Sequence, residues 1–216
     1  MVIVKRIGLT RYAEALHVQE ETHAEVVNGH EDTLILCEHP HVYTLGKSAN
    51  ERNLLIQPDF LKSIQAEVFQ TDRGGDITYH GPGQLVGYPI INLRKHGIGV
   101  KKYVATLELG IVNALAISGI EAYQIDGLTG IWVGEANEVK RKIGAIGIRV
   151  KNGVSMHGFA LNVATDLSYF DHIVPCGIND KEVTSIQKEV PNITIQQFSK
   201  DFISCFQSEW EKALAL

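Results

Sequence analysis

The order of the apolar segments constrains the fold of this chain more than any other feature. A helical pattern at residues 100–117 is followed by four short strand-like segments, EAYQID, GIWVG, KIGAIGIRV and GFALNV, with no helix between them. Strands that follow one another in runs are typical of antiparallel pairing, whereas strict alternation of strand and helix would predict a parallel sheet. We therefore predict an α+β fold, a mixed and largely antiparallel sheet with flanking helices.

The other segments extend this prediction. Helical spacing indicates a helix at residues 10–27 with Thr10 as its cap, a short helix after Pro58 and a C-terminal helix in IQQFSKDFISCFQSEWEKAL. Alternation of period two predicts neighbouring strands in DTLILCEHP and VYTLG, and further strands in AEVFQT and QLVGYPIINL. Proline cannot donate to a sheet ladder, so Pro89 moves the last strand towards a sheet edge or a bulge.

Composition narrows the class of protein. The 216 residues contain no Pro/Ser-rich linker, which predicts a single domain over residues 1–216. The net charge of −5 argues against a surface built for nucleic acid. We expect no contact with a membrane, because no window approaches 18 apolar residues, and a cytoplasmic protein, because the N-terminus lacks a signal-peptide pattern.

The cysteines do not form a recognisable framework. Three of them at wide, irregular spacing indicate neither a set of disulfides nor a zinc motif, and favour a reducing compartment. Cys37, His39 and His41 would share one strand face, but Pro40 interrupts the strand and no fourth ligand stands at a recognised spacing. We therefore expect no metal site.

Glycine recurs inside strand-like sequence in three segments: RGGDITYHGPGQ at residues 73–84, KIGAIGIRV and SMHGFALNV. Each segment alone is typical of a bulge or a turn, since glycine weakens a strand interior. Three together favour a slot where a ligand approaches bare backbone. The phosphate-loop patterns GxGxxG and GxxxxGK[ST] are both absent from the sequence.

Cys176 differs in context from the other two cysteines. It stands between Pro175 and Gly177, a setting that presents the thiol on a turn, whereas Cys37 and Cys205 fall in a strand and on an apolar helix face. A reactive thiol needs a nearby cation or base. The sequence does not choose among four candidates, which are Lys142, His157, His80 and His172. Strand alternation does predict that Lys142 and Arg141 face opposite sides of the sheet.

Four blocks together resemble a known family. RGGDITYHGPGQLVGYPIINL, KIGAIGIRV, HGFALNV and FDHIVPCGI are similar, in this order and across roughly residues 30–187, to the lipoate-protein octanoyltransferases. The resemblance implies the fold of the biotin and lipoate protein ligase catalytic domain. It also implies transfer of an octanoyl group from octanoyl-acyl carrier protein to lysines of lipoyl domains, both those of 2-oxoacid dehydrogenases and the glycine cleavage H protein, with no cofactor.

The resemblance also implies roles for individual residues. Cys176 and Lys142 match the catalytic pair, with an acyl-cysteine thioester as the intermediate. Contacts to the acyl chain and its carbonyl are implied for three blocks, namely Arg73, Gly74, Gly75, Asp76, Ile77, Thr78, Tyr79 and His80; Ala145, Ile146 and Gly147; and Gly158, Phe159 and Ala160. We expect Arg73 and His80 to fix the loop and the carbonyl end of the substrate. Asp76 departs from the pattern, in which glutamine is frequent.

We expect a monomer that meets its acidic partners through local basic clusters, either Lys140, Arg141, Arg149 and Lys151, or Arg94, Lys95, Lys101 and Lys102.

Three alternative functions are weighed against octanoyl transfer. One alternative is an ATP-dependent lipoate or biotin ligase, which has no need of Cys176. A second is a hydrolase that uses Cys176 and His157 with Asp171 or Asp180, and a third is a non-catalytic module that binds acylated protein.

Overall fold

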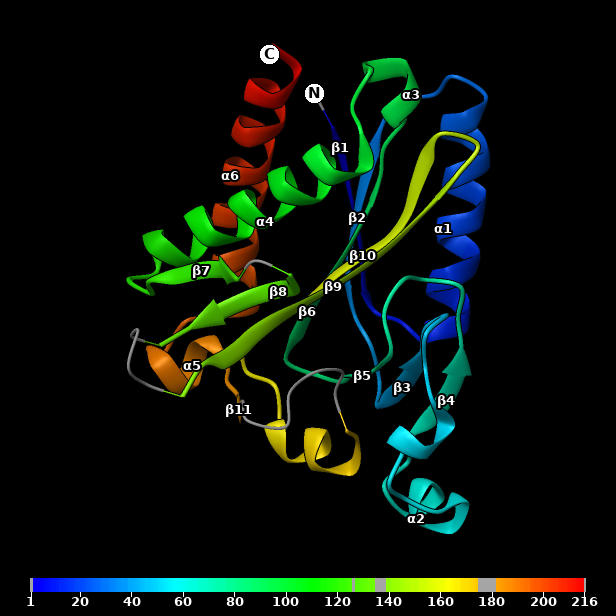
Figure 1. The fold of residues 1–216 in the computed structure, drawn as a ribbon, viewed down its shortest axis with the longest axis vertical. Helices are drawn as coiled ribbons and strands as arrows, with labels where there is room; N and C mark the ends of the chain where they lie inside the picture. Colours follow the sequence, from blue (N-terminus) through cyan, green and yellow to red (C-terminus); the bar gives the residue numbers. More distant parts are fainter. Residues whose placement is uncertain (1, 126, 135–138, 175–181, 216) are drawn as a thin grey trace.

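The computed structural model describes residues 2–125, 127–134, 139–174 and 182–215, and it contains two sheets (Figure 1). The larger sheet has the spatial order β1 (Ile3–Leu9), β2 (Thr33–Glu38), β6 (Gln84–Ile90), β10 (Val154–Asn162), β9 (Arg141–Lys151), β8 (Leu128–Val133) and β7 (Ala122–Ile125), with β11 (Glu182–Val183) paired to β9. The smaller sheet has the order β4 (Glu67–Gln70), β3 (Val42–Leu45) and β5 (Ile77–His80). Among the described strands, the parallel pairs are β1 with β2, β9 with β11 and β3 with β4. The predicted α+β fold with a mixed, largely antiparallel sheet is confirmed.

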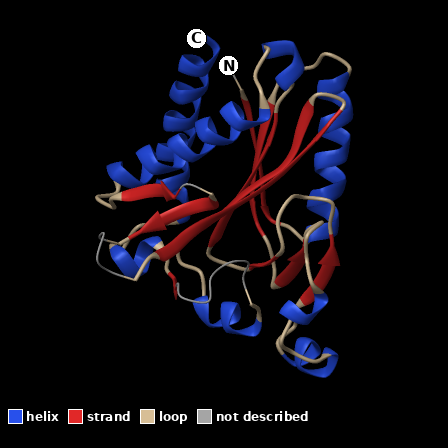
Figure 2. Ribbon diagram, viewed as in Figure 1, coloured by secondary structure: helices blue, strands red, loops and turns tan. Residues whose placement is uncertain are grey.

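Helices cover both faces of the larger sheet (Figures 1 and 2). On one face, α4 (Val100–Ile117) and α6 (Ile195–Ala215) pack against each other, and Phe198, Phe202 and Phe206 of α6 are fully buried. On the other face lies α1 (Tyr12–Val27), whose Ala15 packs in a cluster with Ile35 and Tyr88. The shorter helices are α2 (Pro58–Ser63), α3 (Leu93–His96) and α5 (Ile186–Glu189), and two 3₁₀ turns are η1 (Glu51–Asn53) and η2 (Leu167–His172). Within the described residues, no helix combines the length and apolarity needed to span a membrane.

Three details of the sequence prediction are wrong. Thr10 does not cap α1, because its backbone N–H pairs with Glu38 O and its hydroxyl donates to Ile7 O, which makes Thr10 a continuation of β1. Arg11 holds the cap position instead. The segments DTLILCEHP and VYTLG form β2 and β3, which belong to different sheets. The strand β1 was not predicted at all.

Pro89 was predicted to mark a sheet edge or a bulge, and the edge is wrong. Strand β6 is internal, between β2 and β10, but its ladder to β10 covers Gln84–Gly87 only. The ladder register would set Pro89 opposite His157, which has a left-handed φ of 56°. The missing N–H of Pro89 is therefore accommodated by a local irregularity in β10 rather than by exposure.

Candidate functional site

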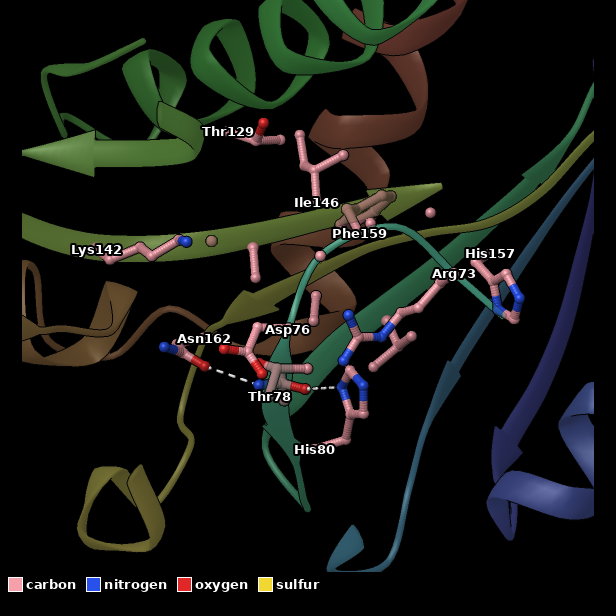
Figure 3. A pocket seen from close by; sticks show the side chains of 18 of the residues that line it. Arg73, Asp76, Thr78, His80, Thr129, Lys142, Ile146, His157, Phe159 and Asn162 are labelled. Atoms are coloured by element: carbon pink, nitrogen blue, oxygen red, sulfur yellow. Dashed lines mark hydrogen bonds between the residues drawn. The ribbon is translucent and has the colours of Figure 1, made fainter. Parts of the chain in front are cut away.

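A cavity of about 390 Å³ lies between β9, β10, β5 and the loop at residues 73–76. Ile146 and Phe159 form an apolar wall in the middle of the view, and the polar side chains of Asp76 and Thr78 lie below them (Figure 3). Lys142 lies at one end of the view, and Arg73 and His157 lie at the other. The size and the mixed lining are typical of a small-molecule site.

Most of the residues expected to contact an acyl chain line this cavity: Arg73, Gly75, Asp76, Ile77, Thr78, His80, Ala145, Ile146, Gly147, Gly158, Phe159 and Ala160. Gly74 and Tyr79 do not. Gly74 donates its N–H to Ile148 O at 2.9 Å and so joins the loop to β9. Tyr79 alternates with Thr78 and His80 on β5, so its side chain points away from the cavity into the core of the smaller sheet, where its hydroxyl lies 2.7 Å from His41 Nδ1.

Lys142 is held near the start of β9 on the cavity side. Its carbonyl accepts the N–H of Thr184 at 2.9 Å, next to the β11 residue Val183 that pairs with it. Its Nζ lies 5.2 Å from the centre of the Trp132 ring, so the side chain runs across the face of that ring. Arg141 faces the other way, as alternation predicted, and donates to Glu189 at 3.0 and 3.1 Å.

The glycines allow strands and loop to approach one another closely. A Cβ on Gly147 would lie 2.8 Å from Gly74 O, and one on Gly158 would lie 2.1 Å from Gly87 O. Backbone of the neighbouring segments therefore fills the space that a side chain on Gly147 or Gly158 would need. The two glycines allow the loop to pack against β9 and β6 to pack against β10. The cavity lies beside these contacts rather than in the place of the missing side chains, and its role as a ligand slot stays a prediction.

Arg73 and His80 are buried at the end away from Lys142. Arg73 donates to Thr44 O at 2.6 Å and to Gly74 O at 3.0 Å, so it ties the loop to the smaller sheet. His80 donates from Nδ1 to Gln84 Oε1 at 2.8 Å. Burial lowers the pKa of His80 to about 3, which keeps the ring neutral near pH 7. These contacts agree with the expected role of Arg73 in fixing the loop, while the expected contact of Arg73 and His80 with the carbonyl end of the substrate stays a prediction.

His157 lies at the same end. Its Nε2 donates to Asp72 at 2.8 Å, and Asp72 also forms an ion pair with Arg149. Burial and the cations of Arg73 and Arg149 lower the pKa of His157 to about 4. The hydrolase alternative paired His157 with Asp171 or Asp180, whereas the carboxylate that holds it is Asp72.

Cys176 and Asp180 lie outside the described residues. The chain on either side is anchored, since Val174 donates its N–H to Asn53 O at 2.8 Å and Thr184 donates to Lys142 O. Phe170 and Val183, which precede and follow Cys176, both line the cavity. His172 Nδ1 lies at hydrogen-bonding distance, 2.8 Å, from the hydroxyl of Tyr43.

Other predicted groups have separate partners. His39 Nε2 lies 2.7 Å from the Tyr88 hydroxyl, while His41 stacks on Tyr169 with ring centres 4.2 Å apart. Cys37 is buried, and burial raises the pKa of its thiol. Of the basic clusters, Arg141 and Arg149 are paired with carboxylates, whereas Arg94, Lys95, Lys101 and Lys102 are exposed around α3 and the start of α4.

Sequence reasoning missed several residues of the cavity. Trp132 faces Lys142 from β8, and Tyr12 enters from the first turn of α1. Asn162 and Gln84 are joined by a hydrogen bond of 2.9 Å behind His80. These residues could have been found only from the register in which the strands pair. The sequence alone does not give that register for segments so far apart in the chain.

Comparison with known proteins identifies the family. Residues 11–207 match the family described as the lipoyl protein ligase A/B catalytic domain. The chain belongs to this family. It is 48% identical over 204 residues to an octanoyltransferase of Bacteroides thetaiotaomicron, covering 92% of this chain and 90% of that protein. It is 44% identical over 207 residues to a mitochondrial octanoyltransferase of Arabidopsis thaliana, covering 94% and 86%. The predicted resemblance to the octanoyltransferases, which are acyltransferases, is confirmed.

Solved structures agree on the fold. A lipoate-protein ligase A bound with ATP gives a TM-score of 0.79 at 17% identity, covering 97% of this chain and 85% of that one. The biotin protein ligase of Aquifex aeolicus gives a TM-score of 0.54 at 10% identity, covering 100% and 72%. The expected biotin and lipoate ligase fold is therefore confirmed.

Proposed function

We propose that this protein transfers an octanoyl group from octanoyl-acyl carrier protein to a specific lysine of lipoyl domains, through a thioester on Cys176. The observation that carries the proposal is the position of Lys142 at one end of a cavity whose wall includes Ile146 and Phe159. The chain lines this cavity before and after Cys176, at Phe170 and Val183. The choice of octanoyl as the transferred group is supported by the relatives, which are named octanoyltransferase.

In the first step the Cys176 thiol gives its proton to the neutral Lys142 amine and attacks the carbonyl of the carrier thioester. The new bond from carbon to the Cys176 sulfur forms as the bond to the carrier sulfur breaks. The Lys142 ammonium group then protonates the departing carrier thiolate. A thioester is exchanged for a thioester, so the step needs no ATP.

In the second step the lysine amine of the lipoyl domain attacks the acyl-cysteine. Lys142 accepts a proton from the attacking nitrogen and returns one to the Cys176 thiolate as it leaves. An amide replaces a thioester, which draws the sequence forward. The oxyanion in both steps needs nearby N–H donors. The 2-oxoacid dehydrogenase lipoyl domains and the glycine cleavage H protein are the proposed acceptors.

An ATP-dependent ligase is the second candidate, favoured by the likeness in fold to the lipoate-protein ligase bound with ATP. A transfer assay separates the two. We expect octanoyl-acyl carrier protein to modify a lipoyl domain without ATP, and Cys176→Ser and Lys142→Met to abolish this transfer. Retention of transfer by Cys176→Ser from free octanoate and ATP would favour the ligase instead.

A further inference from the structure

Asn162, the last residue of β10, carries a buried amide whose orientation is fixed by its neighbours. Gln84 Nε2 donates to Tyr79 O at 3.1 Å and to Asn162 Oδ1 at 2.9 Å (Figure 3). Because a backbone carbonyl only accepts, the bond to Tyr79 identifies the nitrogen end of the Gln84 amide. Asn162 therefore presents its oxygen to Gln84 and its nitrogen to Thr184 O, to which it donates at 3.0 Å.

Gln84 is held from its other side by a histidine. Its Oε1 accepts from His80 Nδ1 at 2.8 Å, and His80 Nε2 accepts from the Thr44 hydroxyl at 3.2 Å. Arg73 Nη2 donates to the same hydroxyl oxygen at 2.9 Å. All five side chains, from Arg73 to Asn162, are buried. They form one network with a single direction of donation, in which each bond polarises the next.

Thr184, which accepts the last of these bonds, is where the chain returns after the segment that contains Cys176. Thr184 is fully buried, and both of its backbone polar atoms are paired. Its N–H donates to Lys142 O at 2.9 Å, and its carbonyl accepts from Asn162. The preceding residue, Val183, pairs with Lys142 and lines the cavity. The Asn162 amide thus fixes the backbone that lies against Lys142.

We propose that Asn162 is a positioning residue for acyl transfer, which holds the backbone at Val183 and Thr184 against Lys142. This inference rests on the proposed function, in which Cys176 and Lys142 exchange a proton. Without the Asn162 amide, Thr184 O would become a buried acceptor with no donor, a cost that the backbone can relieve by moving towards water. Such a movement would draw the chain that continues from Cys176 away from Lys142. A displacement of about 1 Å can slow a reaction about 100-fold.

Alkylation of Cys176 by iodoacetamide at pH 7 tests this without a donor or an acceptor protein. The thiolate is the reacting form, and a cation beside a thiol increases the thiolate fraction. Lys142→Met should therefore slow alkylation about tenfold. We expect Asn162→Ala to slow it by a similar factor, and the double variant to be no slower than Lys142→Met, because both changes disrupt the same pair. Peptide mass spectrometry distinguishes label on Cys176 from label on Cys205.

A second readout separates positioning from a general loss of packing. In transfer from octanoyl-acyl carrier protein, Asn162→Ala should lower kcat about 100-fold and change KM little. Asn162→Ser, which keeps a small polar group, is the second variant if Asn162→Ala does not fold. The matched control is Ser155→Ala. Ser155 is fully buried on the same strand, where its hydroxyl donates to Pro89 O at 2.7 Å and accepts from Ile91 N at 2.9 Å. This variant should keep the wild-type rates of alkylation and transfer.

The outcomes distinguish this inference from the proposed function. If Lys142→Met is slow, wild-type rates in a folded Asn162 variant would overturn the inference and leave the proposed function intact. An equal loss of rate in Ser155→Ala would also overturn the inference alone. Alkylation of Lys142→Met at the wild-type rate would contradict the pairing of Cys176 with Lys142, and with it both the proposed function and this inference.

Discussion

Gly130 and Lys142 are packed so closely that a Cβ on Gly130 would lie 2.6 Å from Lys142 Cε. The same Cβ would lie 2.8 Å from Gly144 O, and Gly130 has a φ of 132°. The backbone of β8 therefore forms the surface on which the Lys142 side chain rests. A side chain at residue 130 has no room unless Lys142 moves.

Gly130→Ala should lower the transfer rate about 100-fold, since displacing a catalytic group by about 1 Å has effects of this size. Octanoate affinity should change little, because the apolar wall is untouched. The control is Gly119→Ala, which also has a positive φ but has nothing within 4 Å of the added Cβ. Steady-state rates of both variants check this, and equal rates would show that Gly130 does not position Lys142.

Asp76 links the loop at residues 73–76 to the chain before Cys176. Its carboxylate accepts from Ile77 N at 2.7 Å and from Asn53 Nδ2 at 2.6 Å, while Asn53 O accepts from Val174 N. Asp76→Ala should reduce the free energy of unfolding by about 2–3 kcal/mol, because buried donors lose their acceptor. Urea denaturation measures this. Asp166→Ala, at an exposed cap, is the control, and similar losses in the two variants would refute a special role for Asp76.

Buried neutral histidines predict a loss of stability in acid. Burial lowers the pKa of His39 to about 4 and of His80 to about 3, from 6.5. Below pH 6.5 the unfolded chain binds protons that the folded protein does not, so stability falls as the pH falls towards 4. Together the two groups should remove about 4 kcal/mol of unfolding free energy between pH 7 and pH 5.

The variant His39→Gln isolates one of these groups. It should show about 2 kcal/mol less change between pH 7 and pH 5 than the wild-type protein, as measured by urea denaturation at each pH. The same fall in both proteins would mean that His39 titrates normally in the folded state.

Local sequence patterns correctly predicted the elements whose own residues show a clear apolar period and a clear end signal. Helix α4 has the predicted bounds, because Leu107, Ile111 and Leu115 repeat on one face and Ser118-Gly119 ends it. Strand β1 escaped notice because it lies at the edge of the sheet and is largely exposed, which weakens its alternation. The sheet edge predicted from Pro89 was wrong because a neighbouring strand can bend around a proline, as β10 does at His157.

The site was predictable only in part, for a related reason. The blocks at residues 73–80, 145–147 and 158–160 meet at one cavity, yet Tyr79 alternates out of it, and the choice of partner for His157 depended on a tertiary contact with Asp72. Trp132 reaches Lys142 through the pairing of β8 with β9, which is a contact that no single segment encodes.

The most direct test of the central claim is intact-protein mass spectrometry after mixing the protein with octanoyl-acyl carrier protein in the absence of ATP. We predict one added octanoyl mass that hydroxylamine removes, that passes to a lysine when a lipoyl domain is added, and that is absent from Cys176→Ala. An unmodified protein that transfers octanoyl only when free octanoate and ATP are supplied would contradict the thioester mechanism.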